Sequence, residues 1–274
     1  MTLLKILNVM PRTYHSINVS KEQQMFLKLL NDYEVEIFSI SEIEEILNHP
    51  FSNLNGILEN LESKGFLSRI ERGKYCLANF RDENVIGSFI SGDGAVAYWS
   101  ALNYHGLTEQ FPNVVFIQTT KPKKDKSVFG TNYKFVKIIS QKLKGIIKEG
   151  YGARTYRITD VEKTVVDCFD YPQYSGGYAE LIRAFVNAQL SSEKIINYCK
   201  AVNNIAATKR MGFLAELFEK KGLRSFIGFA KDQVKDAYNP LDPQGPASGP
   251  FNTEWKLRLN ISRDELLDIA NKQY

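Results

Sequence analysis

The sequence predicts an α+β protein of two domains, and three observations lead to that prediction. At 274 residues the chain exceeds the usual length of one compact domain, and its 43% hydrophobic and 24% charged residues are typical of globular proteins. Helical periodicity dominates the first part, whereas short apolar strands alternate with amphipathic helices in the second. Polar residues 79–84 separate the two parts. We therefore expect a first domain at residues 1–80 and a second at residues 85–274.

The first domain begins with a predicted helix, a short strand and a second helix. Residues 20–32 carry apolar side chains at helical spacing, and residues 34–40 alternate polar with apolar side chains as a strand does. Ser41 is followed by acidic residues that suit a helix dipole, so it is the predicted N-cap of the second helix. The side chains expected to point inward are Met25, Phe26, Leu29, Leu30, Ile43, Ile46 and Leu47.

Residues 51–77 contain the pattern around which the first domain is organised. A helix with Leu54, Ile57, Leu58 and Leu61 on one face ends at Gly65, which suits the left-handed conformation found there. Strand-like residues 66–70 and 74–77 follow, and Glu71-Arg72-Gly73 forms the turn between them. Such an order is typical of a winged helix-turn-helix. The predicted fold is an N-terminal winged helix-turn-helix followed by a larger mixed α/β C-terminal domain.

Polar side chains in this stretch are candidate DNA contacts. Asparagine can form two hydrogen bonds with adenine, glycine lets a helix approach closely, and cations beside a turn can contact phosphates. The candidates are Asn53, Asn55, Gly56, Asn60, Lys64, Arg69, Arg72 and Lys74. The alternative is that these are ordinary helix-start asparagines and hairpin cations in a module that contacts protein. Residues 1–80 hold eight Lys or Arg and ten Asp or Glu, so DNA binding requires the cations to be segregated.

The second domain has strands and helices in alternation, followed by helices. The predicted strands are residues 114–119, 133–139, 156–158 and 254–260, and the predicted helices include residues 95–106, 178–187, 192–202, 206–221 and 225–236. Residues 254–260 alternate strictly and give the clearest strand pattern in the chain. Capping boxes are predicted at Thr159 with Glu162 and at Ser262 with Glu265, each beginning a helix, and Gly222 is the predicted stop of the helix before it.

A basic segment lies within the second domain. Residues 118–150 hold nine lysines against Asp125 and Glu149, and aromatic residues interleave with them. A basic stretch with aromatic residues can follow a nucleic-acid backbone. The candidate basic patch consists of Lys121, Lys123, Lys124 and Lys126. The alternative is a solvated hairpin loop.

No catalytic or metal-binding signature stands out, so we expect no enzyme activity, no metal site and no cofactor. The three cysteines are widely spaced and form no CxxC pair, which excludes an evident zinc finger. Gly87-Ser88 precedes Asp93, but no acid two residues from Asp93 completes the metal-binding pair of a nucleotidyltransferase. Residues 3–10 are apolar but too few for a signal peptide or a membrane span. We therefore expect a cytoplasmic protein with no membrane partner.

Four segments occur in an order that is distinctive as a set. They are RGKYCLA at residues 72–78, GDGAVAYWSALNYHGLTEQ at 92–110, YRITDVEKTVVDCFD at 156–170 and NTEWKLRLNIS at 252–262. With these segments the chain resembles the AbiEi-family antitoxins, the transcriptional regulators of type IV abortive-infection toxin–antitoxin systems. The resemblance covers most of the chain.

The resemblance implies a function for each domain. The first would bind repeats in double-stranded DNA upstream of its own operon and repress it. The second would neutralise a nucleotidyltransferase-like toxin, with or without direct contact. The acidic balance of residues 1–80 departs from the basic DNA-binding face of the family. The alternative is a protein-interaction module, or an uncharacterised nucleic-acid-processing enzyme, in which the winged helix is structural.

Overall fold

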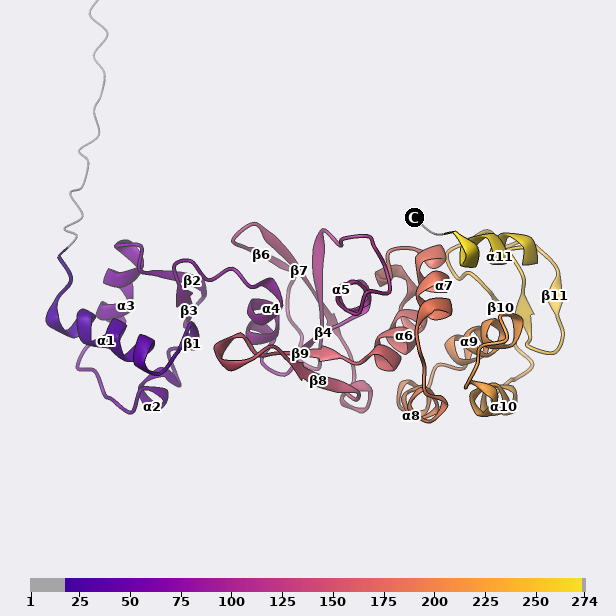
Figure 1. The fold of residues 1–274 in the computed structure, drawn as a ribbon, viewed down its shortest axis with the longest axis horizontal. Helices are drawn as coiled ribbons and strands as arrows, with labels where there is room; N and C mark the ends of the chain where they lie inside the picture. The colour runs from indigo at the N-terminus through magenta and orange to yellow at the C-terminus, as the bar shows by residue number, and fades with distance from the viewer. Residues whose placement is uncertain (1–17, 273–274) are drawn as a thin grey trace, which may run out of the picture. The chain divides into compact units, whose positions relative to one another are not determined.

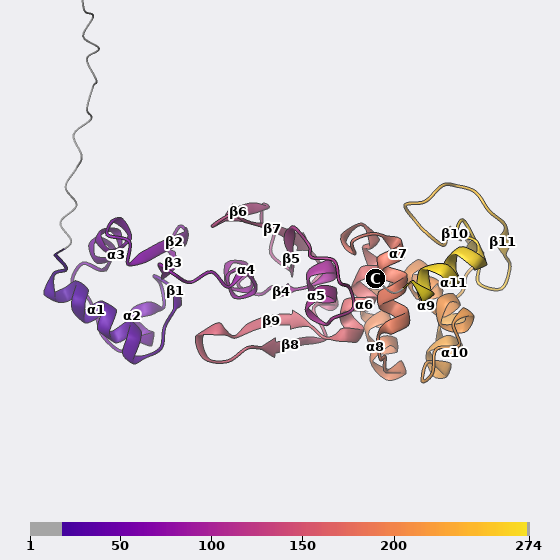
Figure 2. The same ribbon diagram turned by 45° about the horizontal axis from the view of Figure 1, so that its top comes forward.

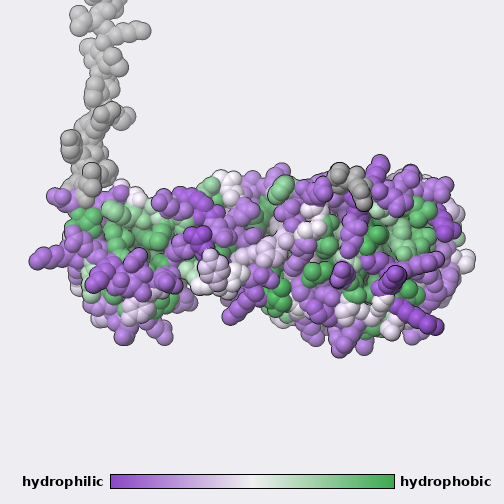
Figure 3. Space-filling model, viewed as in Figure 1, coloured by the Kyte–Doolittle hydropathy of each residue, from purple (hydrophilic) through white to green (hydrophobic). Residues whose placement is uncertain are grey.

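The computed structural model describes residues 18–272 and divides the chain into two compact units, Met1–Phe80 and Arg81–Tyr274 (Figure 1). Each unit combines helices with a sheet, so the α+β class is confirmed. Hydrophilic side chains cover most of the face drawn in Figure 3, and apolar side chains show between them. No helix within the described residues is long and apolar enough to cross a membrane.

The first unit has the order helix, strand, helix, helix and two-stranded ribbon. Its elements are α1 (Lys21–Asp32), β1 (Ile37–Ser39), α2 (Ile43–Ile46), α3 (Leu54–Ser63), β2 (Leu67–Glu71) and β3 (Lys74–Leu77). The three strands form an antiparallel sheet in the order β1-β3-β2. This is the order of elements on which the winged-helix prediction depends.

The first unit is held together by one apolar core. Phe26 of α1 packs edge-on against Phe38 of β1, with 5.8 Å between ring centroids, and both side chains are buried. Leu58 and Leu61 of α3 are buried in the same cluster. Ser20 caps α1 in a reciprocal arrangement with Gln23, which confirms the start predicted for this helix. Met25 of the same helix was expected to point inward but is 42% exposed.

The structure corrects two predictions about α2. Ser41 is not its N-cap: Glu42 occupies that position without a side-chain cap, and the Ser41 hydroxyl lies 3.0 Å from the Ser39 hydroxyl. Ile46 was expected to point inward but is 41% exposed, whereas Ile43 and Leu47 are buried. Since α2 has only four residues, it makes a single turn and buries one narrow face.

The second unit begins with a mixed sheet and ends with helices. Its helices are α4 (Glu83–Ser91), α5 (Tyr98–Tyr104), α6 (Val161–Asp170), α7 (Tyr178–Asn187), α8 (Ser192–Val202), α9 (Ile205–Leu217), α10 (Arg224–Asp232) and α11 (Arg263–Asn271). Its strands are β4 (Ala95–Val96), β5 (Val114–Thr119), β6 (Lys126–Val128), β7 (Thr131–Lys137), β8 (Ile146–Glu149), β9 (Tyr156–Thr159), β10 (Asn239–Pro240), β11 (Phe251–Asn252) and β12 (Leu257–Arg258). Short 3-10 helices lie at Ser140–Lys142, Gly152–Arg154 and Pro172–Tyr174.

The main sheet has the strand order β6-β7-β5-β4-β9-β8, and helices cover both of its faces. Phe116 and Ile117 are neighbours in β5 and therefore point to opposite faces. Ile117 packs beside Gly87 of α4, whereas Phe116 packs against Tyr98 of α5. Helices α7 to α11 gather at the other end of this unit in both views (Figures 1 and 2).

Four sequence predictions for the second unit are wrong. The helix predicted over residues 95–106 begins only at Tyr98, because Ala95 and Val96 form strand β4 of the main sheet. Residues 254–260 contain only the two-residue strand β12, because residues 253–256 form turns and Lys256 has a φ of 49°. Asp160 rather than Thr159 caps α6, and the Thr159 hydroxyl instead lies 2.7 Å from that of Thr164. Helix α9 ends at Leu217 and so does not reach Gly222. The capping box of Ser262 and Glu265 on α11 is confirmed.

Candidate nucleic-acid interface

Helix α3 presents a polar face to solvent because its apolar face is used by the core. Ile57, Leu58 and Leu61 are buried at 4% exposure or less, and they recur at the spacing of one helix face. The exposed side chains of the opposite face are Asn55, Glu59, Asn60 and Ser63. This face therefore offers amide, hydroxyl and carboxylate groups to a partner.

Three of the predicted DNA contacts have side chains that hold the first unit together. Asn53 is the N-cap of α3, and its Oδ1 accepts a hydrogen bond from Gly56 N at 3.0 Å. Asn60 Nδ2 donates to the Gly56 carbonyl at 2.7 Å, along the same helix. Lys64 Nζ donates to the Asn18 carbonyl at 2.8 Å and to Gln23 Oε1 at 2.9 Å. Asn53 and Asn60 thus stabilise α3 itself, and Lys64 connects the end of α3 to α1.

Gly56 has a structural explanation as well as the predicted one. A Cβ at this position would lie 2.5 Å from Nδ2 of Asn53, which is closer than such atoms approach. Glycine therefore leaves room for the Asn53 cap at the start of α3. Asn55, next to it, is exposed and makes no hydrogen bond through its side chain to any of the described residues.

The ribbon after α3 carries the remaining predicted cations. Arg69 pairs in register with Tyr75, and its guanidinium lies 6.0 Å from the centre of the Tyr75 ring. Arg72 is exposed at the turn, where Gly73 has a φ of 73°. Lys74 forms an ion pair with Glu71 at 3.2 Å. Arg69 and Arg72 are thus the two cations of the ribbon that no carboxylate of the described residues pairs with.

The predicted basic patch of the second unit is divided by the structure. Lys123 Nζ donates to the Ile90 carbonyl at the end of α4, at 2.8 Å, whereas Lys121 and Lys124 are exposed. Lys126 begins β6 and is half-buried. Cations at a helix C-terminus are favoured by its dipole, so part of this charge stabilises α4.

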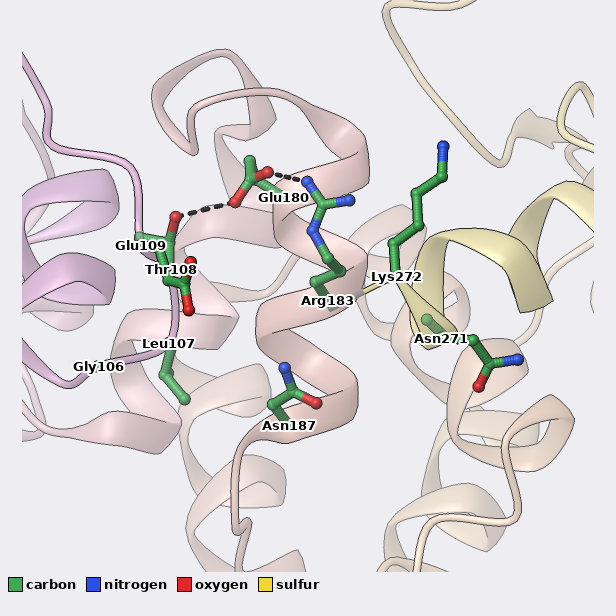
Figure 4. A pocket seen from close by; sticks show the side chains of 10 residues that line it. Gly106, Leu107, Thr108, Glu109, Glu180, Arg183, Asn187, Asn271 and Lys272 are labelled. Atoms are coloured by element: carbon green, nitrogen blue, oxygen red, sulfur yellow. Dashed lines mark hydrogen bonds and ion pairs between the residues drawn. The ribbon is translucent and has the colours of Figure 1, made fainter. Parts of the chain in front are cut away.

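A cavity of about 450 Å³ in the second unit lies between α7, the chain after α5 and the end of α11 (Figure 4). Buried Glu180 lines it and accepts hydrogen bonds from Thr108 Oγ1 at 2.8 Å and Gln110 Nε2 at 3.0 Å. The same carboxylate forms an ion pair with Arg183. Glu180 therefore connects the chain after α5 to α7. Sequence reasoning missed this contact because the residues that make it are about 70 positions apart.

The structure offers no metal centre within residues 18–272, since no three His, Cys, Asp or Glu side chains there come close enough to hold an ion. The cavity in Figure 4 is lined by no serine, cysteine or histidine. Its one hydroxyl, that of Thr108, is already donated to Glu180. The cavity therefore presents polar contacts that are organised around Glu180.

Comparison with known proteins identifies a shared fold. No protein-family model matches the sequence, and no curated protein matches it. Among solved structures, the crystal structure of the Rv2827c protein from Mycobacterium tuberculosis is similar, with a TM-score of 0.60. The match covers 90% of this chain and 94% of that chain at 13% sequence identity. Similarity at that level of identity establishes the fold alone.

Proposed function

We propose that the protein is a DNA-binding transcriptional repressor that serves as the antitoxin of its operon, as the resemblance to the AbiEi family implies. The observation that carries the proposal is the exposed polar face of α3 followed by a ribbon with two exposed arginines, Arg69 and Arg72, which no carboxylate of the described residues pairs with. In a winged helix the last helix enters the major groove and the ribbon lies along the backbone. Asn55 would then face base edges, and the arginines would face phosphates.

The second unit is proposed to neutralise a nucleotidyltransferase-like toxin, by contact or by countering its effect on a shared target. A cytoplasmic location belongs to the same proposal, and Cys76, Cys168 and Cys199 support it because all three are buried free thiols. A second candidate function is protein recognition by the first unit. Glu59 on the exposed face of α3 favours it, since a carboxylate repels phosphates.

Fluorescence anisotropy with a labelled duplex from immediately upstream of the gene tests the proposal. A scrambled duplex is the comparison, and both are titrated across a salt series. Sequence-dependent binding that weakens with salt supports a repressor. Equal and weak binding to both duplexes would favour protein recognition instead.

Reversing the two ribbon arginines is expected to weaken duplex binding about 100-fold. In the variant Arg69→Glu/Arg72→Glu, two phosphate contacts are lost, so the slope of log affinity against log salt should fall by about 1.8. The matched control is Lys221→Glu/Lys235→Glu, which makes the same charge change at exposed sites of the second unit. Similar loss of binding in both variants would assign the effect to net charge and contradict a site on the ribbon.

Two asparagines of α3 are expected to differ in their effect on sequence preference. Asn55→Ala should reduce discrimination between the operator and scrambled duplexes by about 1–3 kcal/mol, because one bidentate base contact is lost. Asn60→Ala should leave it nearly unchanged, since Asn60 already donates to the Gly56 carbonyl. For each variant, the measurement is the ratio of the dissociation constant for the scrambled duplex to that for the operator duplex. A larger effect for Asn60 would mean that the helix reads DNA through another face.

A further inference from the structure

Four cations gather around the end of α4 in the second unit. Arg157 of β9 donates to the Gly92 carbonyl, and Lys123 donates to the Ile90 carbonyl at 2.8 Å. Nζ of Lys121 lies 4.0 Å from the position that a Cβ would take at Gly92. Lys148 of β8 stands directly opposite Arg157 in the antiparallel pair, so the two side chains share one face of the sheet.

The nearby carboxylates leave this cluster positive. Asp93 accepts hydrogen bonds from the Thr119 hydroxyl at 2.5 Å and from Thr120. Burial raises the pKa of Asp93, but these hydrogen bonds outweigh burial and hold the pKa below its ordinary value. Glu149 follows Lys148 in β8 and therefore points to the other face, where it accepts from the Tyr104 hydroxyl at 2.9 Å. One ionised carboxylate thus lies among four cations.

Helix capping explains only part of this charge. Lys123 and Arg157 each donate to a carbonyl at the end of α4, where cations are favoured. Lys121 and Lys148 are exposed, and neither makes a side-chain hydrogen bond or ion pair to the described residues. Two ammonium groups therefore face solvent on a surface that is already positive.

An exposed aromatic ring lies on the same hairpin as Lys148 and Arg157. Tyr151 lies at the tip of the β8–β9 hairpin and is 84% exposed. It is three residues beyond Lys148 in the sequence, just past the end of β8 at Glu149. Gly150 makes the tip narrow: its φ is 82°, and a Cβ there would lie 2.2 Å from the Arg154 carbonyl oxygen. In both views the hairpin projects on the side of α4, away from helices α7 to α11 (Figures 1 and 2).

We propose that this surface, formed by Lys121, Lys148, Arg157 and Tyr151, binds single-stranded nucleic acid. Phosphates would lie against the cations, and an unpaired base would stack on the Tyr151 ring. A duplex buries the faces of its bases, so the exposed ring favours a single strand over a duplex. The site lies in the second unit and is independent of the duplex binding proposed for α3 and the ribbon.

Anisotropy of the full chain with a fluorescein-labelled oligouridylate tests the site, with the oligodeoxyuridylate of the same length beside it. Tyr151→Ser should weaken binding about tenfold, because one stacking contact is lost and the exposed ring contributes little to folding. Lys121→Glu/Lys148→Glu should weaken binding at least tenfold and lower the salt slope by about 1.4. If the RNA and DNA oligonucleotides bind equally well, the site recognises phosphate and base. If the RNA binds more tightly, the site also contacts the 2′-hydroxyl.

Matched variants separate this site from the proposed repressor function. Lys221→Glu/Lys235→Glu should leave binding of the single strand near the wild-type value after the same charge change. Arg69→Glu/Arg72→Glu should weaken only the operator duplex, and Lys121→Glu/Lys148→Glu only the single strand. The proposal is overturned if the wild type does not bind either strand, if Tyr151→Ser binds as tightly as wild type, or if the Lys221/Lys235 control loses as much affinity.

Discussion

Replacing Lys163 by methionine is expected to lower the free energy of unfolding by about 3–5 kcal/mol. Lys163 and Asp167 lie one turn apart on α6, form an ion pair and are buried at 0% and 2% exposure. The substitution leaves Asp167 as a buried carboxylate without its partner. Asp167 Oδ2 has no hydrogen-bond partner among the described residues, so no hydrogen bond to that oxygen compensates for the lost cation. Urea unfolding followed by circular dichroism measures the loss.

The double variant Lys163→Met/Asp167→Leu distinguishes the cost of an orphaned charge from the value of the pair. Apolar side chains of similar size fill the same space, so most of the stability lost in Lys163→Met should return. The single variant Asp167→Leu should be as damaging as Lys163→Met because it leaves the ammonium unpaired. A double variant as unstable as either single one would show that the pair itself stabilises α6.

The same pair predicts a dependence of stability on pH. Burial raises the pKa of Asp167 to about 6, although Lys163 opposes that shift. In the unfolded chain an aspartate has a pKa of about 4, so between these values the native state binds more protons than the unfolded state. The free energy of unfolding therefore falls as pH rises from about 4 to about 6. If the free energies of unfolding of the wild type and of Lys163→Met/Asp167→Leu differ by the same amount across that range, the assignment to Asp167 is contradicted.

Local patterns predicted those parts of the fold that local interactions determine. The bounds predicted for α7, α8, β3 and β5 match the structure, because apolar periodicity and flanking turn residues mark each of them. Edge strands β6 and β8 were not predicted: they have only three and four residues, and neither alternates polar with apolar side chains clearly enough to mark a strand. The alternating pattern of residues 254–260 predicted a strand wrongly, because Trp255 is buried by helices rather than by a strand partner.

In the candidate interface, too, the sequence predicted the features that depend on local patterns and missed those that depend on distant contacts. Sequence alone could place Asn55, Arg69 and Arg72 on a polar surface, because α3 and the hairpin have clear local patterns. It could not show that Lys64 is held by Asn18, which lies 46 residues away. Such contacts decide which polar side chains remain available to a ligand, and only the folded chain specifies them.

Truncating Trp255 to alanine is expected to destabilise the protein by about 3–5 kcal/mol. The side chain is 1% exposed and stands beside α9, where its Nε1 donates to Glu216 at 2.7 Å. Trp255→Phe should cost less, because it keeps most of the ring packing, and Glu216 retains Lys231 at 2.6 Å. Thermal unfolding of the three proteins provides the comparison. Equal losses for alanine and phenylalanine would assign the effect to the hydrogen bond rather than to packing.

Gly212 supplies an independent test of the same contact. A Cβ there would lie 2.5 Å from the Trp255 ring and 2.7 Å from Cβ of Ala230, so Gly212→Ala is expected to cost about 1–3 kcal/mol. In an unhindered helix the same change would instead stabilise by about 0.5–1 kcal/mol. Combined with Trp255→Ala, the substitution should cost much less, because its methyl group enters the space left by the ring. Additive losses in the double variant would show that Trp255 does not confine Gly212, and that another neighbour limits the packing of α9.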